Sequence, residues 1–88
     1  MIVNVTAEFN KDISRLRDKK TLLAIKESLT QIETAQSLFE MASVKKLQGA
    51  PGYYRIRIGD YRMGLYVDGV TVTVSRFLHR KEIYRYFP

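Results

Sequence analysis

Apolar and polar side chains alternate along residues 53–66, and this alternation predicts two strands that each bury one face. The apolar positions of the first strand are Tyr54, Ile56 and Ile58. Gly59-Asp60 comes next and is typical of a two-residue hairpin turn that begins with glycine. Such a turn places Arg57 directly opposite Arg62, and Arg55 opposite Gly64.

A second hairpin follows, because Asp68-Gly69 is a strong turn signal between two alternating runs. A two-residue turn there places Met63 opposite Val74 and Arg62 opposite Ser75. The three strands then form a meander with one apolar and one polar face. The polar face carries Arg55, Arg57, Arg62, Thr71, Thr73 and Ser75. Like charges that face each other directly destabilise a sheet, so the facing arginines favour a polyanion that lies across this face.

The first 35 residues predict a strand followed by two helices. The strand has the apolar positions Ile2, Val3 and Val5 and is expected to join the sheet at an edge. Thr6 is a suitable N-cap for a first helix, which ends near residues 17–18. Its apolar positions are Phe9, Ile13 and Leu16. Thr21 is the expected N-cap of a second helix, and the very short connection predicts an antiparallel helix hairpin. The apolar stripe of that second helix consists of Leu22, Ile25, Leu29 and Ile32.

Proline and glycine in the segment Gly49-Ala50-Pro51-Gly52 stand in the order that a type II turn prefers. Residues 79–88 are expected to form a short helical or irregular tail. Together, the elements predict a single α+β domain over residues 1–88. It consists of an N-terminal strand, an antiparallel helix hairpin, a three-stranded antiparallel meander and a short C-terminal helix. We expect the helices to pack on one face of the sheet.

Composition and charge narrow the chemistry. The 88-residue chain has no cysteine and a single histidine, so disulfides, cysteine nucleophiles and metal sites are not expected, and neither is a cofactor. No apolar run approaches the ~20 residues that a membrane span needs, and Asn4 interrupts the apolar start, so we expect no signal peptide and a cytoplasmic location. Basic and acidic residues balance over positions 1–44, so the net charge of +6 lies in positions 45–88. This asymmetry indicates a nucleic acid or another polyanion as partner.

Three segments carry a family resemblance: 46–57, 59–62 and 79–84. They read KLQGAPGYYRIR, GDYR and HRKEIY, and they resemble the RelE/ParE superfamily of toxins from bacterial and archaeal toxin–antitoxin modules. RelE-type members are small basic nucleases that cut messenger RNA on the ribosome, whereas ParE-type members share the fold and act on DNA gyrase. The resemblance implies a toxin of a type II toxin–antitoxin system that inhibits translation as a ribosome-dependent mRNA endonuclease.

The resemblance also implies catalytic roles for Arg55, Arg57, Arg62, Arg80 and Tyr84. His79 is added to these catalytic candidates on chemical grounds. RelE-type enzymes often have lysine at the positions of Arg55 and Arg57, and arginine stays protonated and is a poor general base. His79 is a candidate because imidazole titrates near neutral pH. The residues expected to bind RNA outside the catalytic set are Lys45, Lys46, Arg76, Lys81 and Arg85.

Cleavage of this kind is metal-independent, because the RNA's own 2′-hydroxyl attacks the adjacent phosphorus. Arginines bind the phosphate and stabilise its developing charge, and each such donor contributes about 2.7–4 kcal/mol. Proton transfer falls to His79 or to Tyr84, the tyrosine only if nearby cations favour its ionised form.

Two other functions stay open on the sequence. One is ParE-like inhibition of DNA gyrase by protein–protein contact, and the other is a degenerate toxin homologue that binds RNA without cutting it. For the nuclease, the expected partners are mRNA, the ribosome and a cognate antitoxin protein that is acidic where it binds.

Overall fold

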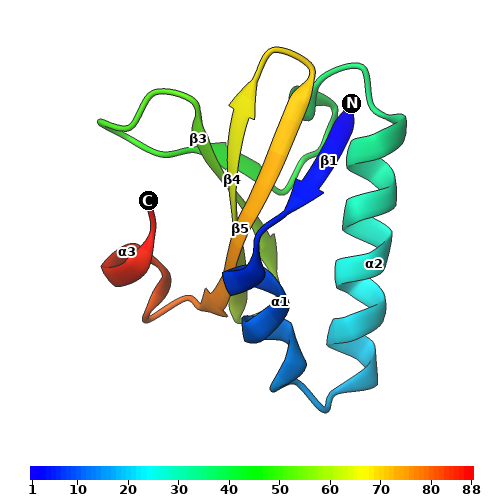
Figure 1. The fold of residues 1–88 in the computed structure, drawn as a ribbon, viewed down its shortest axis with the longest axis vertical. Coiled ribbons are helices and arrows are strands. Elements are labelled where there is room, and N and C mark those ends of the chain that lie inside the picture. The colour runs from blue at the N-terminus through cyan, green and yellow to red at the C-terminus, as the bar shows by residue number, and fades with distance from the viewer.

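The computed structural model describes all of residues 1–88 as a five-stranded sheet with helices on both sides (Figure 1). The strands are β1 (Ile2–Val5), β2 (Val44–Lys46), β3 (Tyr53–Ile58), β4 (Tyr61–Asp68) and β5 (Thr71–His79). The helices are α1 (Ala7–Ser14), α2 (Lys19–Thr34), α3 (Ile83–Tyr86) and the single 3₁₀ turn η1 (Leu38–Glu40). None of the helices is long and apolar enough to cross a membrane.

The strand order is β1-β5-β4-β3-β2, with β1 parallel to β5 and all other neighbours antiparallel. The prediction that the N-terminal strand joins the sheet at an edge is therefore confirmed. The predicted three-stranded meander is incomplete, because β2 extends it beyond β3. Only three residues form β2, which is too few for a period-two pattern to be recognised.

The N-terminal helix boundaries follow from side-chain caps. Thr6 caps α1 as predicted, since its hydroxyl oxygen accepts a 3.1 Å hydrogen bond from the Phe9 amide. The predicted cap of α2 at Thr21 is wrong, because α2 begins at Lys19 and is capped by Asp18. The Asp18 carboxylate accepts bonds from the amide of Lys20 (3.1 Å) and from the hydroxyl of Thr21 (2.8 Å), so Thr21 supports the cap from inside the helix.

The type II turn before β3 is also confirmed. Its closing bond runs from the Tyr53 amide to the Ala50 carbonyl at 3.1 Å. Gly52, at the third turn position, has a φ of +83°, a value that glycine adopts without strain.

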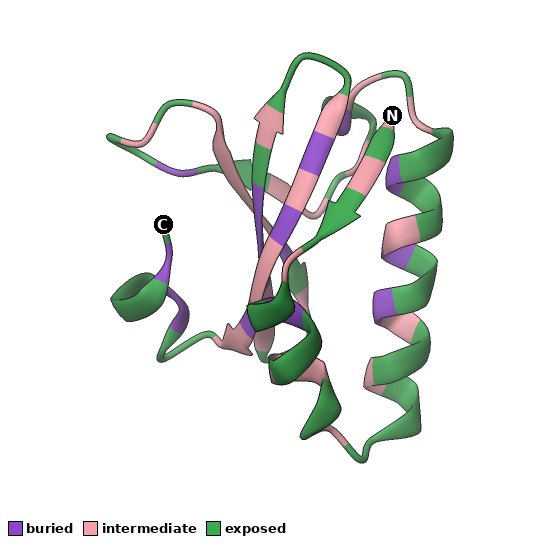
Figure 2. Cartoon of the chain, in the orientation of Figure 1, coloured by how far each residue is buried: buried purple, intermediate pink, exposed green.

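The main core lies between the sheet and the pair α1 and α2, and the buried positions of α2, purple in Figure 2, lie on its side toward the sheet. The core receives one buried apolar side chain from α1 and two from α2, and β3, β4 and β5 supply the facing layer. The ten buried members are Phe9, Ile25, Ile32, Leu38, Ile56, Met63, Leu65, Val72, Val74 and Phe77. We call this side of the sheet the core face and the opposite side the open face.

The turn between β4 and β5 differs from the prediction. The two turn residues are Gly69 and Val70 instead of Asp68 and Gly69, so Met63 does not pair with Val74, and Arg62 does not pair with Ser75. Gly69 has a φ of +59°, and Val70 is exposed. The turn therefore begins with glycine, as Gly59-Asp60 does. Glycine adopts the positive φ that the first residue of such a turn needs, and alternate residues of both strands stay on the core face.

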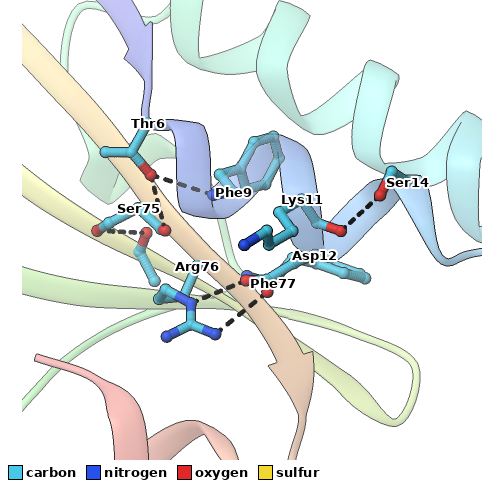
Figure 3. Close-up of polar contacts among 9 residues, drawn as sticks. Thr6, Phe9, Lys11, Asp12, Ser14, Ser75, Arg76 and Phe77 are labelled. Carbon is cyan, nitrogen blue, oxygen red and sulfur yellow. Dashed lines mark hydrogen bonds and ion pairs between the residues drawn. The ribbon is translucent and has the colours of Figure 1, made fainter.

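A β-bulge at Ser75 then changes the register a second time. Leu65 pairs with Val74, but Gly64 pairs with Arg76, and Ser75 is left without a cross-strand partner. Phe77 consequently faces the core, and Arg76 reaches the open face. The carbonyl of Ser75 accepts a 2.9 Å bond from the Thr6 hydroxyl, so the cap of α1 also holds the bulge (Figure 3).

The third helix corrects the expectation that all helices pack on one face. α3 lies on the open face, where Leu47, Ile83 and Phe87 form a buried cluster separate from the main core. Gly64 makes this packing possible: a Cβ there would lie 2.8 Å from three ring atoms of Phe87. The C-terminal segment therefore packs against the sheet at Gly64, where there is no side chain in its way.

Candidate functional site

The first hairpin has the register that the sequence predicts. Arg57 pairs with Arg62, and Arg55 pairs with Gly64. Lys45 of β2 pairs with Arg55, which adds a further cation to the same row of the open face. The sheet thus presents cations from three adjacent strands on the side away from α1 and α2.

Arg62 lies at the centre of this cluster of positively charged side chains. Its guanidinium donates to the carbonyls of Gly59 (3.0 Å) and Tyr61 (2.8 Å) at the hairpin end. Partial burial and the neighbouring charge of Arg55 lower the pKa of Arg62 from its ordinary value. Arg57 and Arg80 also lower this pKa, whereas Tyr84 raises it.

Arg80 and Tyr84 reach the site from the segment after β5. The Arg80 amide donates a 2.8 Å bond to the Asp60 carbonyl, which fixes the backbone at the hairpin turn. The Arg80 side chain makes only a loose contact of 3.9 Å with the Asp60 carboxylate, and both groups are exposed. Tyr84 belongs to α3 and is 60% exposed. Both side chains are therefore accessible to a ligand on the open face.

A groove of about 430 Å³ adjoins this cluster. It runs between the β2–β3 connection and the C-terminal segment, with Arg55 and Tyr84 on its wall. Its lining residues are Lys45, Lys46, Leu47, Gln48, Ala50, Arg55, Tyr84, Phe87 and Pro88. The groove suits a nucleotide, because its cations and its amide can bind the phosphate and its aromatic surface can stack on the base.

His79 does not join the arginines. It pairs with Tyr61, and Tyr61 stacks on the buried ring of Phe77 at a centroid distance of 5.1 Å. The His79 ring meets the Tyr61 ring edge-to-face at 5.7 Å, on the core face of the sheet. Its Nδ1 accepts a 3.2 Å bond from the Lys81 amide. The contacts of the His79 ring are therefore with Tyr61 and with the Lys81 amide, and not with Arg55, Arg57 or Arg62.

Arg76 is engaged within the fold. Its Nε and Nη2 donate to the two carboxylate oxygens of Asp12 at 2.9 and 3.1 Å (Figure 3). The hydrogen bond that Arg76 donates to Asp12 raises the pKa of Arg76 above its ordinary value, and the charges of Asp12 and Glu8 act in the same direction. A guanidinium held in this way is poorly placed to bind RNA. The other expected RNA-binding residues, Lys45, Lys46, Lys81 and Arg85, are exposed.

Sequence reasoning missed the importance of Asp12 and Gly64. Asp12 reads as one more charge on an exposed helix, and no spacing rule links it to Arg76, which is 64 residues later. Gly64 reads as a weak point in a strand, although a glycine within a strand also marks a place of close approach. The bulge left a signal, because the buried positions Val74 and Phe77 are three residues apart instead of two.

The structure brings together no group of three or more His, Cys, Asp or Glu side chains that could hold a metal ion.

Comparisons with known proteins agree with this architecture. The family described as "ParE toxin of type II toxin-antitoxin system, parDE" matches residues 3–84. Toxin RelE3 of Methanocaldococcus jannaschii is 45% identical over 65 residues, which are 73% of this chain and 74% of that protein.

Solved structures extend the comparison. In a RelB-RelE antitoxin–toxin complex from Methanococcus jannaschii, a chain matches with a TM-score of 0.82 and 36% identity, covering 97% of this chain and 99% of that one. A chain of the RelE-RelB complex from Pyrococcus horikoshii OT3 matches with a TM-score of 0.75 at 23% identity, over 93% and 97% of the two chains, and supports the fold. The protein therefore belongs to the RelE/ParE family of toxins from type II toxin–antitoxin systems.

Proposed function

We propose that this protein is a ribosome-dependent mRNA endonuclease that inhibits translation. The observation that carries the proposal is the convergence of Arg55, Arg57, Arg62 and Arg80 with Tyr84 on the open face, where their charges act on one another. Folding alone gives no reason for this arrangement, since facing cations oppose sheet formation. A phosphate bound among them removes the repulsion.

The chemistry follows from what these side chains provide. The 2′-oxygen of a ribose attacks the adjacent phosphorus, the bond from phosphorus to the 5′-oxygen breaks, and a 2′,3′-cyclic phosphate and a 5′-hydroxyl result. The arginines bind the non-bridging phosphate oxygens and stabilise their extra charge in the transition state, where each donor contributes about 2.7–4 kcal/mol. They also orient the ribose for in-line attack.

Proton transfer is assigned to Tyr84. Its ring is exposed in α3, beside Arg62 and on the wall of the groove. His79 lies on the core face, where its ring packs against Tyr61, so it is the weaker candidate for a phosphate bound on the open face. The same tyrosine also offers a surface on which a base stacks. Dependence on the ribosome fits a site with few proton-transfer groups, because the ribosome is then needed to position the RNA.

The protein partner is an antitoxin. Structures of the relatives from Methanococcus jannaschii and Pyrococcus horikoshii contain RelB partners. A partner of this protein is expected to be acidic where it binds, because the net charge is +6. It neutralises the toxin by covering the arginines or by displacing the C-terminal segment, and its association is sensitive to salt.

The test is to induce the protein in cells and map new RNA ends. We expect 5′-hydroxyl ends at fixed positions within codons of translated messages. Arg62→Gln should abolish these ends. Arg15→Gln is the matched control, because Arg15 is an exposed arginine in the α1–α2 connection, outside the cluster. Ends that are independent of translation, or that persist in Arg62→Gln, would contradict the proposal.

Gyrase inhibition is the second candidate, because the matching family carries the ParE description. It predicts DNA breaks and a DNA-damage response on induction, with no new RNA ends. A non-catalytic homologue, suggested by arginine in place of lysine at positions 55 and 57, predicts RNA or ribosome binding without either kind of break. The same induction experiment separates all three outcomes.

A further inference from the structure

Asp12 is a carboxylate whose bonding is complete inside the protein. Its side chain is 8% exposed, and its oxygens accept bonds from Nε and Nη2 of Arg76 and from the amide of Phe77 at 2.9 Å. Figure 3 shows the contact between α1 and the strand just after the bulge. Arg76 is thereby fixed in position and direction, since a bidentate pair defines the plane of the guanidinium.

The fixed guanidinium of Arg76 also contacts α3. Its central carbon lies 5.7 Å from the centroid of the Tyr86 ring, within the range of a cation–π interaction. Arg76 therefore lies between Asp12 of α1 and Tyr86 of α3. This contact connects the C-terminal helix to an element on the other side of the sheet.

A second contact lies beside the first. Gly64 is the cross-strand partner of Arg76, and the ring of Phe87 packs onto it. Phe87 also meets the Tyr53 ring edge-to-face at 5.5 Å. Consecutive residues of the chain, Tyr86 and Phe87, thus rest on paired positions of β5 and β4. Because α3 has only four residues, its orientation comes from these contacts and not from its own hydrogen bonds.

We propose that Arg76, held by Asp12, is a positioning residue that orients α3 so that Tyr84 faces the arginines of the open face. Tyr86 and Tyr84 are two residues apart on α3, so a rotation of α3 about the contact between Phe87 and Gly64 moves Tyr84 away from Arg62. The inference rests on the proposed nuclease function for its effect on cleavage. The claim that Arg76 holds α3 in place does not depend on that function.

The test compares Tyr86→Leu with Tyr86→Phe, because phenylalanine keeps the aromatic face that Arg76 contacts and leucine does not. Arg76→Lys is a second variant that retains the charge opposite Asp12 but loses the bidentate fork. The first readout is hydrogen exchange of the Phe87 amide, which bonds to the Ile83 carbonyl at 2.8 Å and closes α3. The second is ribosome-bound mRNA cleavage, separated into single-turnover rate and binding.

We expect Tyr86→Leu and Arg76→Lys to raise the exchange rate of the Phe87 amide about two- to five-fold, the factor that an exposed cation–π contact supplies. The single-turnover rate should fall while ribosome binding is unchanged, and Tyr86→Phe should restore both values. Unchanged exchange in Tyr86→Leu overturns the proposal, as does raised exchange with a wild-type cleavage rate. If the wild-type protein cuts no RNA, the proposed function fails, and exchange alone decides whether Arg76 holds α3.

Discussion

Replacing Gly64 by alanine tests whether the C-terminal segment is held by a close approach of ring to backbone. The added Cβ would lie 2.8 Å from Cγ, Cδ1 and Cε1 of Phe87, closer than side-chain carbons approach one another. Either the ring or the strand must move. Forcing one methyl group into a packed site costs about 1–3 kcal/mol. If the ring leaves entirely, the lost burial of Phe87 costs about 1.5–3 kcal/mol, so the two routes together predict a loss of about 1–3 kcal/mol.

The double variant with Phe87→Ala shows whether this cost arises from the ring. Without the ring, the three atoms nearest to the methyl group at position 64 are gone, and alanine in a strand is about 0.5–1 kcal/mol more favourable than glycine. Gly64→Ala should therefore destabilise the wild type and be neutral or stabilising in the Phe87→Ala background. Urea unfolding of the four proteins measures the coupling. The same cost in both backgrounds, or no cost in either, would refute the packing argument.

Three further predictions concern single side chains. Arg62→Gln should leave the free energy of unfolding within about 0.5 kcal/mol of wild type. Burial and Arg55 lower the pKa of Arg62, so the charged side chain destabilises the folded state at every pH below that pKa. This destabilisation is lost only as the pH rises through the lowered pKa. Added salt should therefore stabilise the wild type more than Arg62→Gln in urea unfolding, and equal salt dependence would disprove this. Thr6→Ala should cost about 1 kcal/mol through loss of the α1 cap, while Thr6→Ser, which keeps the bonds to Phe9 and Ser75, should stay near wild type in the same assay. Tyr84→Phe should lower the single-turnover cleavage rate, and His79→Ala should not. A lower cleavage rate in a His79→Ala protein that is as stable as wild type would show that His79 takes part in proton transfer.

Local patterns in the sequence predicted the first hairpin well. The alternation of Ile56 and Ile58 with arginines, together with a turn that starts with glycine, determines which residues face each other. Both the turn and the face are properties of neighbouring residues, so no distant contact is needed to infer them. The facing pair of Arg57 and Arg62 followed from this register and led to the candidate site.

Long-range contacts decided what the sequence could not predict. The bulge at Ser75 depends on Thr6 and Asp12, which lie more than sixty residues earlier and bond to the backbone at Ser75 and Phe77. The face that α3 occupies depends on the absence of a side chain at Gly64. Arg76 was assigned to RNA because its charge is visible in the sequence and its partner Asp12 is not. A basic residue can be counted from the sequence, but its availability depends on contacts that only the fold reveals.

The parallel pairing of β1 with β5 also has a consequence for how the chain folds. Residues 2–5 find their sheet partners at residues 71–74, so most of the chain lies in the loop that this pairing closes. Contacts so distant in sequence form late and slow the folding of small domains. During synthesis, the helix hairpin and β3–β4 can form while β1 still lacks a partner. The nascent toxin therefore assembles its arginine hairpin before its edge strand, and the last step of folding adds β1 to the sheet beside β5.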